Sequence, residues 1–201
     1  MFDSKLRPLI DPPLNRLGSA LAGCGVTANQ VTVAGAVFGA LAGVAIALGH
    51  PLVGLALILV NRLLDGLDGA VARATRPTDF GGYLDIVCDY VFYLAVPLGF
   101  GFAASQHLPY ALVLVATFTL TGVSFLAFAT LAARRGVETT THGAKSFFYS
   151  NGIAEGAETI LAFVLMCLLP SWFPLIATVF AMLCILTVIQ RSLIARRTFP
   201  D

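Results

Sequence analysis

The segment NRLLDGLDGAVARATRPTDFGGYLDIVCDY, residues 61–90, decides the fold of this chain, because it places four aspartates in apolar surroundings. An acidic side chain at the centre of a membrane helix costs about 2.5–3.5 kcal/mol, so four cost on the order of 10 kcal/mol before an interfacial position reduces the total. Asp65 and Asp68 are three residues apart and share one helix face. Asp85 and Asp89 are four apart and also share a face. Two such helices, packed side by side, are expected to direct all four carboxylates at one point.

Four carboxylates at one point repel each other, and cations between them relieve the repulsion. We expect Mg²⁺ or Mn²⁺, hard ions that prefer oxygen ligands and share them with substrate phosphates. The histidines and cysteines are poorly placed as ligands, which argues against zinc. The alternative is that the aspartates are structural charges paired with the arginines nearby in sequence, Arg62, Arg73 and Arg76.

Small residues flank the first acidic pair, namely Gly66, Gly69, Ala70 and Ala72. They remove side-chain bulk, so that a nucleotide or a neighbouring helix backbone can approach closely. Helix packing alone is the alternative interpretation of these residues.

The composition is that of a membrane protein, with 58% apolar and 11% charged residues among 201. Six stretches are long and apolar enough to cross a bilayer as helices, roughly 31–49, 52–73, 82–104, 108–133, 153–169 and 172–195. We therefore predict an all-α polytopic membrane protein, with a single domain over 1–201 and a six-helix bundle over 31–195. Residues 1–20 are expected to form an amphipathic helix at the interface, with an unstructured tail as the alternative.

The basic residues predict how the chain crosses the membrane. Eleven of the twelve flank one end of the predicted spans, and the opposite connections 49–51, 105–107 and 170–171 contain none. Because basic residues in short loops are retained in the cytoplasm, both termini and the aspartates are expected there, in a bacterial inner membrane. Arg62 is the exception, because it lies inside the second span. A net charge of +1 with no basic repeat argues against nucleic-acid binding.

The acidic segment resembles the signature of the CDP-alcohol phosphotransferases, D-x-x-D-G-x-x-A-R followed by G-x-x-x-D-x-x-x-D. The matching residues are Asp65, Asp68, Gly69, Ala72, Arg73, Gly81, Asp85 and Asp89. The resemblance implies transfer of a substituted phosphate group from a CDP-linked donor, such as CDP-diacylglycerol, to an acceptor alcohol. The products would be a phospholipid and CMP. A homodimer among membrane lipids is implied in the same way.

The resemblance also implies roles for individual residues. Asp65, Asp68 and Asp85 would hold two metal ions, while Asp89 would hold one of them and act as the general base. Gly69, Ala72, Arg73 and Gly81 would line the donor site.

The stretch VTANQVT, residues 26–32, resembles a further segment of the family and implies that Thr27, Asn29 and Thr32 face the nucleotide. A helix N-cap formed by Thr27 or Asn29 is a compatible alternative.

The long connection 134–151 is where the acceptor is expected to enter. Arg134, Arg135 and Lys145 are the candidate acceptor contacts, with anchoring of the helix end at the cytoplasmic interface as the alternative. Glu155 and Glu158 either cap the helix that follows or face the active cavity.

Two other classes of function use different features. An ion or proton transporter also places carboxylates in a membrane, but it is expected to have broken helices and inverted repeats, and no repeat is visible. A membrane scaffold has no use for an ordered acidic cluster. The enzyme is therefore the favoured prediction, and the transporter is the alternative.

Overall fold

The computed structural model describes residues 3–136 and 152–199. Over these ranges the chain forms α helices joined by short turns, with two 3₁₀ turns and no strand. The helices are α1 (Asp3–Gly23), α2 (Ala28–Ala47), α3 (Pro51–Ala74), α4 (Asp79–Ala103), α5 (Leu108–Arg134), α6 (Gly156–Leu168) and α7 (Phe173–Thr198). The prediction of an all-α fold is confirmed. Helices α2 to α7 match the six predicted spans to within three residues at every end.

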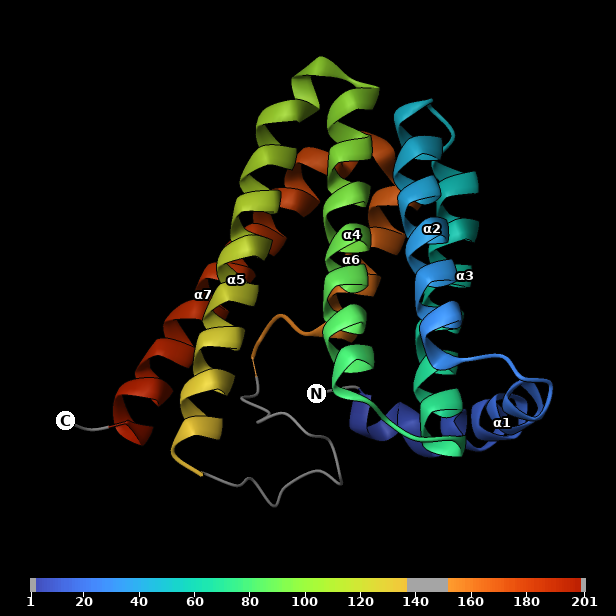
Figure 1. The fold of residues 1–201 in the computed structure, drawn as a ribbon. Coiled ribbons are helices and arrows are strands. Elements are labelled where there is room, and N and C mark those ends of the chain that lie inside the picture. Colours follow the sequence, from blue (N-terminus) through green and yellow to red (C-terminus); the bar gives the residue numbers. More distant parts are fainter. Residues whose placement is uncertain (1–2, 137–151, 200–201) are drawn as a thin grey trace.

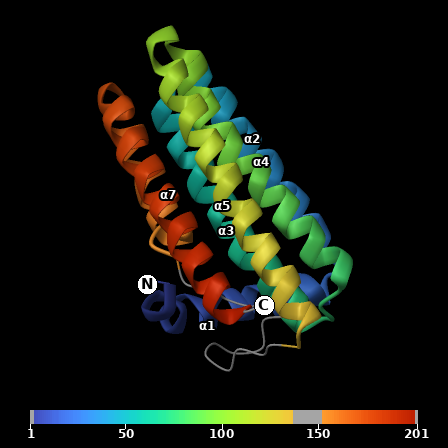
Figure 2. The ribbon, with the colours of Figure 1, turned by 90° about the vertical axis from the view of Figure 1, so that its left-hand side faces the viewer.

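The helices α2 to α7 form a bundle, and α1 lies across one end of it (Figure 1). Figure 2, at right angles, shows the same crossing arrangement beneath the long helices. Residues 3–23 are helical, so an unstructured tail is not what the structure shows. Helix α1 packs against α3, where its Leu14, Leu21 and Ala22 meet Leu67 and Val71.

Local signals in the sequence explain where the helices begin. Thr27 caps α2: its hydroxyl accepts from Gln30 N at 3.3 Å, while Thr27 N donates to the Gln30 side chain at 3.0 Å. Thr78 caps α4 by accepting from Gly81 N at 3.0 Å. Gly49, with φ of 82°, turns the chain before Pro51 starts α3.

Among the described residues, four helical segments are long and apolar enough to cross a membrane: Ala28–Ala47, Asp79–Ala103, Ser105–Arg134 and Pro170–Thr198. Helix α6 is apolar but shorter, and α3 carries charged residues in its second half. Large apolar side chains are exposed along these helices, for example Leu48, Leu52 and Phe102. Such a surface suits contact with lipid tails.

The main core draws buried side chains from all the helices α2 to α7. It is rich in aromatic rings, including Phe92, Phe118 and Phe163, which meet edge to face or tilted at centroid distances of 5.4 to 5.9 Å. It joins α4 to α5 and α6, while α2 packs against both α3 and α4. The acidic face of α4 is thereby turned toward α2 and α3.

Helices α2 and α4 approach closely because small residues face each other. A Cβ atom added to Gly43 would lie 2.5 Å from the carbonyl oxygen of Ala95, which is part of a helix backbone and cannot move aside. We expect Gly43→Ala to lower the free energy of unfolding by about 1–3 kcal/mol, because overpacking outweighs the better helix propensity of alanine. The measurement is the thermal midpoint in detergent.

Gly23→Ala is the matched control, because a Cβ at Gly23 meets no atom within 4 Å. It should leave the midpoint unchanged or slightly raised. Equal midpoints for the two variants would show that the close contact between α2 and α4 is not required.

Candidate active site

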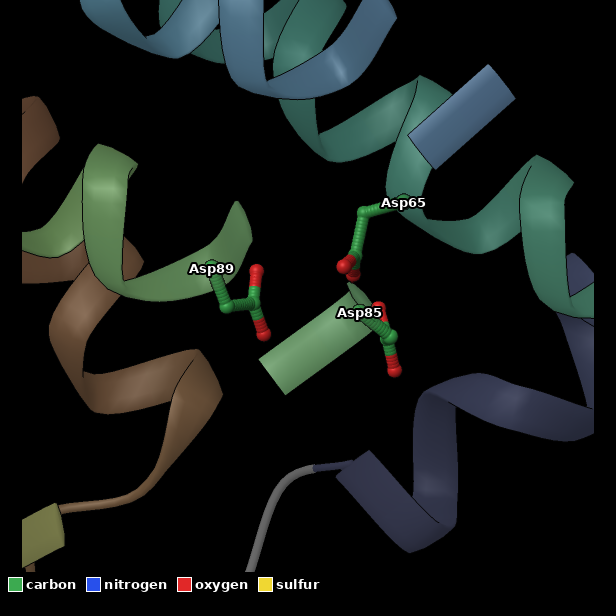
Figure 3. A group of neighbouring side chains, drawn as sticks. All are labelled: Asp65, Asp85 and Asp89. Carbon is green, nitrogen blue, oxygen red and sulfur yellow. The ribbon is translucent and has the colours of Figure 1, made fainter. Parts of the chain in front are cut away.

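The structure brings the four aspartates to one cavity between α2, α3 and α4. Asp65, Asp68, Asp85 and Asp89 all line it, together with Thr32, Gly35, Ala36, Asn61, Arg62 and Cys88. Figure 3 shows Asp65 on α3 near Asp85 and Asp89 on α4. One carboxylate oxygen from each of these three lies within 4.8 Å of the others. The predicted convergence of the two acidic pairs is therefore what the structure shows.

Asp68 is the least solvent-exposed of the four aspartates and is held from α2. Its side chain is buried, and its Oδ2 accepts a hydrogen bond from Thr32 Oγ1 at 2.8 Å. Thr32 also contacts the Ala28 carbonyl oxygen at 3.0 Å. The three-carboxylate group does not include Asp68, which lines the same cavity one helical turn further along α3.

Arg62 enters the cavity one turn before Asp65. Its Nη2 donates to Asp89 Oδ1 at 3.0 Å, and its Nη1 lies 3.5 Å from Asp65 Oδ2. The guanidinium carbon lies 4.2 Å from the centroid of the buried Phe92 ring. The sequence marked Arg62 as an exception to the charge pattern, and the structure shows that it pairs with the acids.

Two residues at the cavity were not singled out from the sequence. Asn61 is 3% exposed, and its side chain joins Arg62 to the backbone of α2. A polar residue inside an apolar span was the available signal. Cys88 also lines the cavity, because it lies one residue before Asp89, but it is not part of the group of possible metal ligands.

The residues present suit a divalent cation of the hard class. Every atom in the three-membered group is a carboxylate oxygen, the ligand that Mg²⁺ and Mn²⁺ prefer. The four carboxylates and Arg62 give the cavity a formal charge of −3, that is −4 plus +1. A divalent ion would offset most of that charge, so the donor set fits the predicted metal.

Of the residues assigned to the CDP donor, Thr32 lines the cavity, whereas the other five are not among its lining residues. Asn29 Oδ1 lies near Gly81, because a Cβ added there would be 3.2 Å from it. At the end of α3, Gly69 adjoins Arg73, and Ala72 is half-buried. The Arg73 guanidinium donates from Nε and Nη2 to Asn15 Oδ1 on α1, at 3.3 and 3.0 Å.

The candidate acceptor residues are not at the cavity in the part of the chain that the structure describes. Arg134 and Arg135 are exposed at the end of α5, and the Arg135 guanidinium lies 5.4 Å from the Phe199 ring centroid. Lys145 lies outside the described residues.

Glu155 and Glu158 serve the start of α6, which decides between the two interpretations of these acids. Glu155 Oε1 accepts from Gly152 N at 2.8 Å, and Glu158 Oε2 accepts from Glu155 N at 3.3 Å. Thr187 on α7 accepts from the backbone N–H groups of Ile153 and Ala154. The segment before α6 is thereby fixed to α7.

Arg191 is one of the eleven basic residues that flank one end of the predicted spans, and the structure shows that it is buried, with 6% of it exposed. Its Nη1 donates to Thr121 O at 2.8 Å and Ser124 Oγ at 2.7 Å, both on α5. A polar face on α5 makes this burial possible, because the arginine exchanges water for protein hydrogen bonds.

Comparison with known proteins finds relatives along most of the chain. Residues 25–191 match the family model of the CDP-alcohol phosphatidyltransferases. The chain is 46% identical over 192 residues to the inner membrane protein YnjF of Escherichia coli, covering 95% of this chain and 93% of YnjF. Archaetidylinositol phosphate synthase of Pyrococcus horikoshii is 41% identical over 87 residues, which span 43% of this chain and 46% of that synthase.

Solved structures share the fold. The phosphatidylinositol phosphate synthase of Mycobacterium tuberculosis, in complex with manganese and citrate, superposes with a TM-score of 0.74 at 21% identity, covering 94% of this chain and 90% of that one. The same synthase with CDP-DAG bound gives a TM-score of 0.71 at 19% identity, covering 91% and 93%. At this identity the likeness shows the arrangement of helices.

The family model extends over most of the chain, and YnjF matches nearly all of it. Together with the apolar helices, the match to an inner membrane protein identifies an integral membrane protein. The enzyme prediction is confirmed over the transporter, because the matched model is that of a transferase. This chain belongs to the CDP-alcohol phosphatidyltransferase family.

Proposed function

We propose that this chain transfers a phosphatidyl group from CDP-diacylglycerol to an acceptor alcohol, forming a phospholipid and releasing CMP. The observation that supports this reaction is the convergence of four aspartates on one cavity in a member of this family. CDP-diacylglycerol is the favoured donor because a related synthase of the same fold has been solved with it bound.

The aspartates would hold two divalent ions, Mg²⁺ or Mn²⁺. Asp65, Asp68 and Asp85 would ligate both ions, and Asp89 one of them. When bound, such ions neutralise the pyrophosphate of the donor and the charge that develops on the leaving CMP. The oxygen-only group of Asp65, Asp85 and Asp89 supports this assignment.

Asp89 is the proposed general base. Its carboxylate takes the proton from the acceptor hydroxyl, whose oxygen attacks the phosphorus that carries the diacylglycerol. A phosphorus–oxygen bond to the acceptor forms, the pyrophosphate bond breaks, and CMP leaves with its electron pair. Thr32 keeps Asp68 oriented by the hydrogen bond from α2.

The substrates are placed by residues around this centre. We propose that Gly69, Ala72, Arg73, Gly81, Asn29 and Thr32 contact the CDP donor. Arg134, Arg135 and Lys145 are the proposed acceptor contacts. Thr32 supports the donor assignment most directly, because it lines the same cavity as the aspartates.

We further propose six crossing helices, α2 to α7, with both termini and the site in the cytoplasm of a bacterial cell and α1 on the membrane interface. Helix α1 crosses one end of the bundle (Figure 1). The last turns of α3, α5 and α7 lie at the same end and carry Arg73, Arg134, Arg196 and Arg197. Basic residues gathered at one end support this orientation. The proposed assembly is a homodimer.

The purified protein is expected to release CMP from CDP-diacylglycerol only with a divalent ion and a suitable acceptor. The assay compares Mg²⁺, Mn²⁺ and EDTA with glycerol 3-phosphate, serine, inositol phosphate and phosphatidylglycerol as acceptors. One acceptor should give metal-dependent CMP release, and its product identifies the alcohol. If no acceptor gives metal-dependent CMP release, the proposed reaction is wrong.

Replacing the base should stop chemistry while the donor still binds. For Asp89→Asn we expect kcat to fall by about 100- to 10,000-fold, the range that general base catalysis contributes. Binding of CDP-diacylglycerol, measured by calorimetry with Mg²⁺, should change little. Near-normal CMP release from this variant would refute the base assignment.

Replacing a proposed metal ligand should raise the metal concentration needed for half-maximal activity. We expect about a tenfold or larger increase for Asp65→Asn, because it removes one carboxylate charge from the group. Asp79→Asn is the matched control, since Asp79 is an exposed aspartate in the first turn of α4. Equal metal requirements in the two variants would remove Asp65 from the ligand set.

A further inference from the structure

Arg62 is the one cation among the described residues that line the acidic cavity, and its guanidinium is held on several sides. Nη2 contacts Asp89 on α4 at 3.0 Å, and Nη1 lies 3.5 Å from Asp65 on its own helix. The ring of Phe92 lies under the guanidinium, with 4.2 Å between its centroid and the guanidinium carbon. The arginine side chain is 17% exposed. These contacts together hold the guanidinium in one position between α3 and α4.

Asn61 connects Arg62 to the third helix of the site. Its Nδ2 donates to the Gly35 carbonyl oxygen on α2 at 2.8 Å, and its Oδ1 accepts from Arg62 Nε at 2.8 Å. A continuous path of hydrogen bonds therefore runs from the α2 backbone through Asn61 and Arg62 to Asp89. Because Asn61 is buried, this path lies within the protein and not in solvent.

This geometry differs from that of an arginine that only extends to the membrane surface. A snorkelling arginine points its head group along its own helix toward water. Arg62 instead points across to α4 and contacts the proposed base. Its planar fork lets it contact Asn61, Asp65 and Asp89 at once, which the single amine of lysine cannot reproduce.

We propose that Arg62 is a positioning residue, which holds the Asp89 carboxylate in place and supplies a resident positive charge that limits how tightly the four aspartates bind divalent ions. This inference rests on the proposed function, because it gives Arg62 a task in that reaction. It acts through Asp89 and has no assigned contact with a substrate.

The two parts of the role act in opposite directions on metal binding. Loss of orientation at a ligand weakens binding, whereas loss of a nearby positive charge strengthens it. The charge effect is expected to dominate, because a full charge a few ångströms away interacts more strongly than one positioning hydrogen bond. Removing Arg62 should therefore tighten metal binding and slow the reaction.

The test measures Mn²⁺ binding to the donor-free protein by electron paramagnetic resonance, and steady-state CMP release separately. For Arg62→Gln we expect Mn²⁺ affinity to rise by about tenfold. We expect kcat to fall by about 10- to 100-fold, the range seen when a residue that orients a metal ligand is replaced. A misfolded or loosened site would instead lose both metal affinity and turnover.

Two further variants separate charge from position. Arg62→Lys keeps the charge, so its Mn²⁺ affinity should stay within about threefold of the wild type while kcat remains low. Asn61→Leu removes the link to α2 and keeps the charge of the arginine, so kcat should fall while Mn²⁺ affinity does not rise above that of the wild type. Arg197→Gln is the matched control, because Arg197 is exposed at the end of α7, and neither quantity should change.

The proposal is overturned if Arg62→Gln binds Mn²⁺ no more tightly than the wild type, or if its loss of activity lies in the KM for the donor. If Arg62→Gln does not fold, Arg62→Lys decides, and a kcat within about twofold of the wild type contradicts positioning. If the wild-type protein binds Mn²⁺ but none of the tested acceptors gives CMP release, the proposed reaction is wrong instead. The two failures are therefore distinguishable.

Discussion

Electrostatic repulsion among four carboxylates, gathered where α3 and α4 face each other, is the constraint on which the rest of the structure depends. The protein offsets this repulsion with groups from three helices. Thr32 of α2 donates to Asp68, and Arg62 of α3 contacts Asp89 of α4. Each of these contacts crosses between helices, so the acidic cluster and the packing of α2, α3 and α4 require one another.

Close packing of these helices needs small residues as well as polar contacts. Gly39 of α2 lies against Phe92, and Gly43 lies against the backbone of α4 near Ala95. These glycines bring α2 near enough for Asn61 to reach the Gly35 carbonyl oxygen. Phe92 has a double role, because one part of it packs in the aromatic core and its ring face supports Arg62. The core and the site are thus joined through one side chain of α4.

Much of this architecture was predictable from the sequence, because periodicity and length carry the information. The spacing of the aspartates fixed which helix faces they share, and apolar length located each helix closely. The direction of long side chains was not predictable. Arg62 and Arg191 each lie in or beside a span, and only tertiary packing shows that one meets Asp89 and the other the α5 backbone. Their partners are distant in sequence, so no local pattern reveals them.

The position of the cavity suits a substrate that is part lipid and part nucleotide. For the proposed donor, acyl chains must stay beside apolar surface while the pyrophosphate reaches charged groups. Asp65 and Asp68 lie in the half of α3 nearer the end that α1 crosses, and the helices beyond them expose leucine and valine side chains. Arg73 of α3 contacts Asn15 of α1 at that end. In the proposed arrangement, with α1 on the membrane interface, this tie between α1 and α3 would set the depth of the acidic cavity and place the reaction at the level of the head groups.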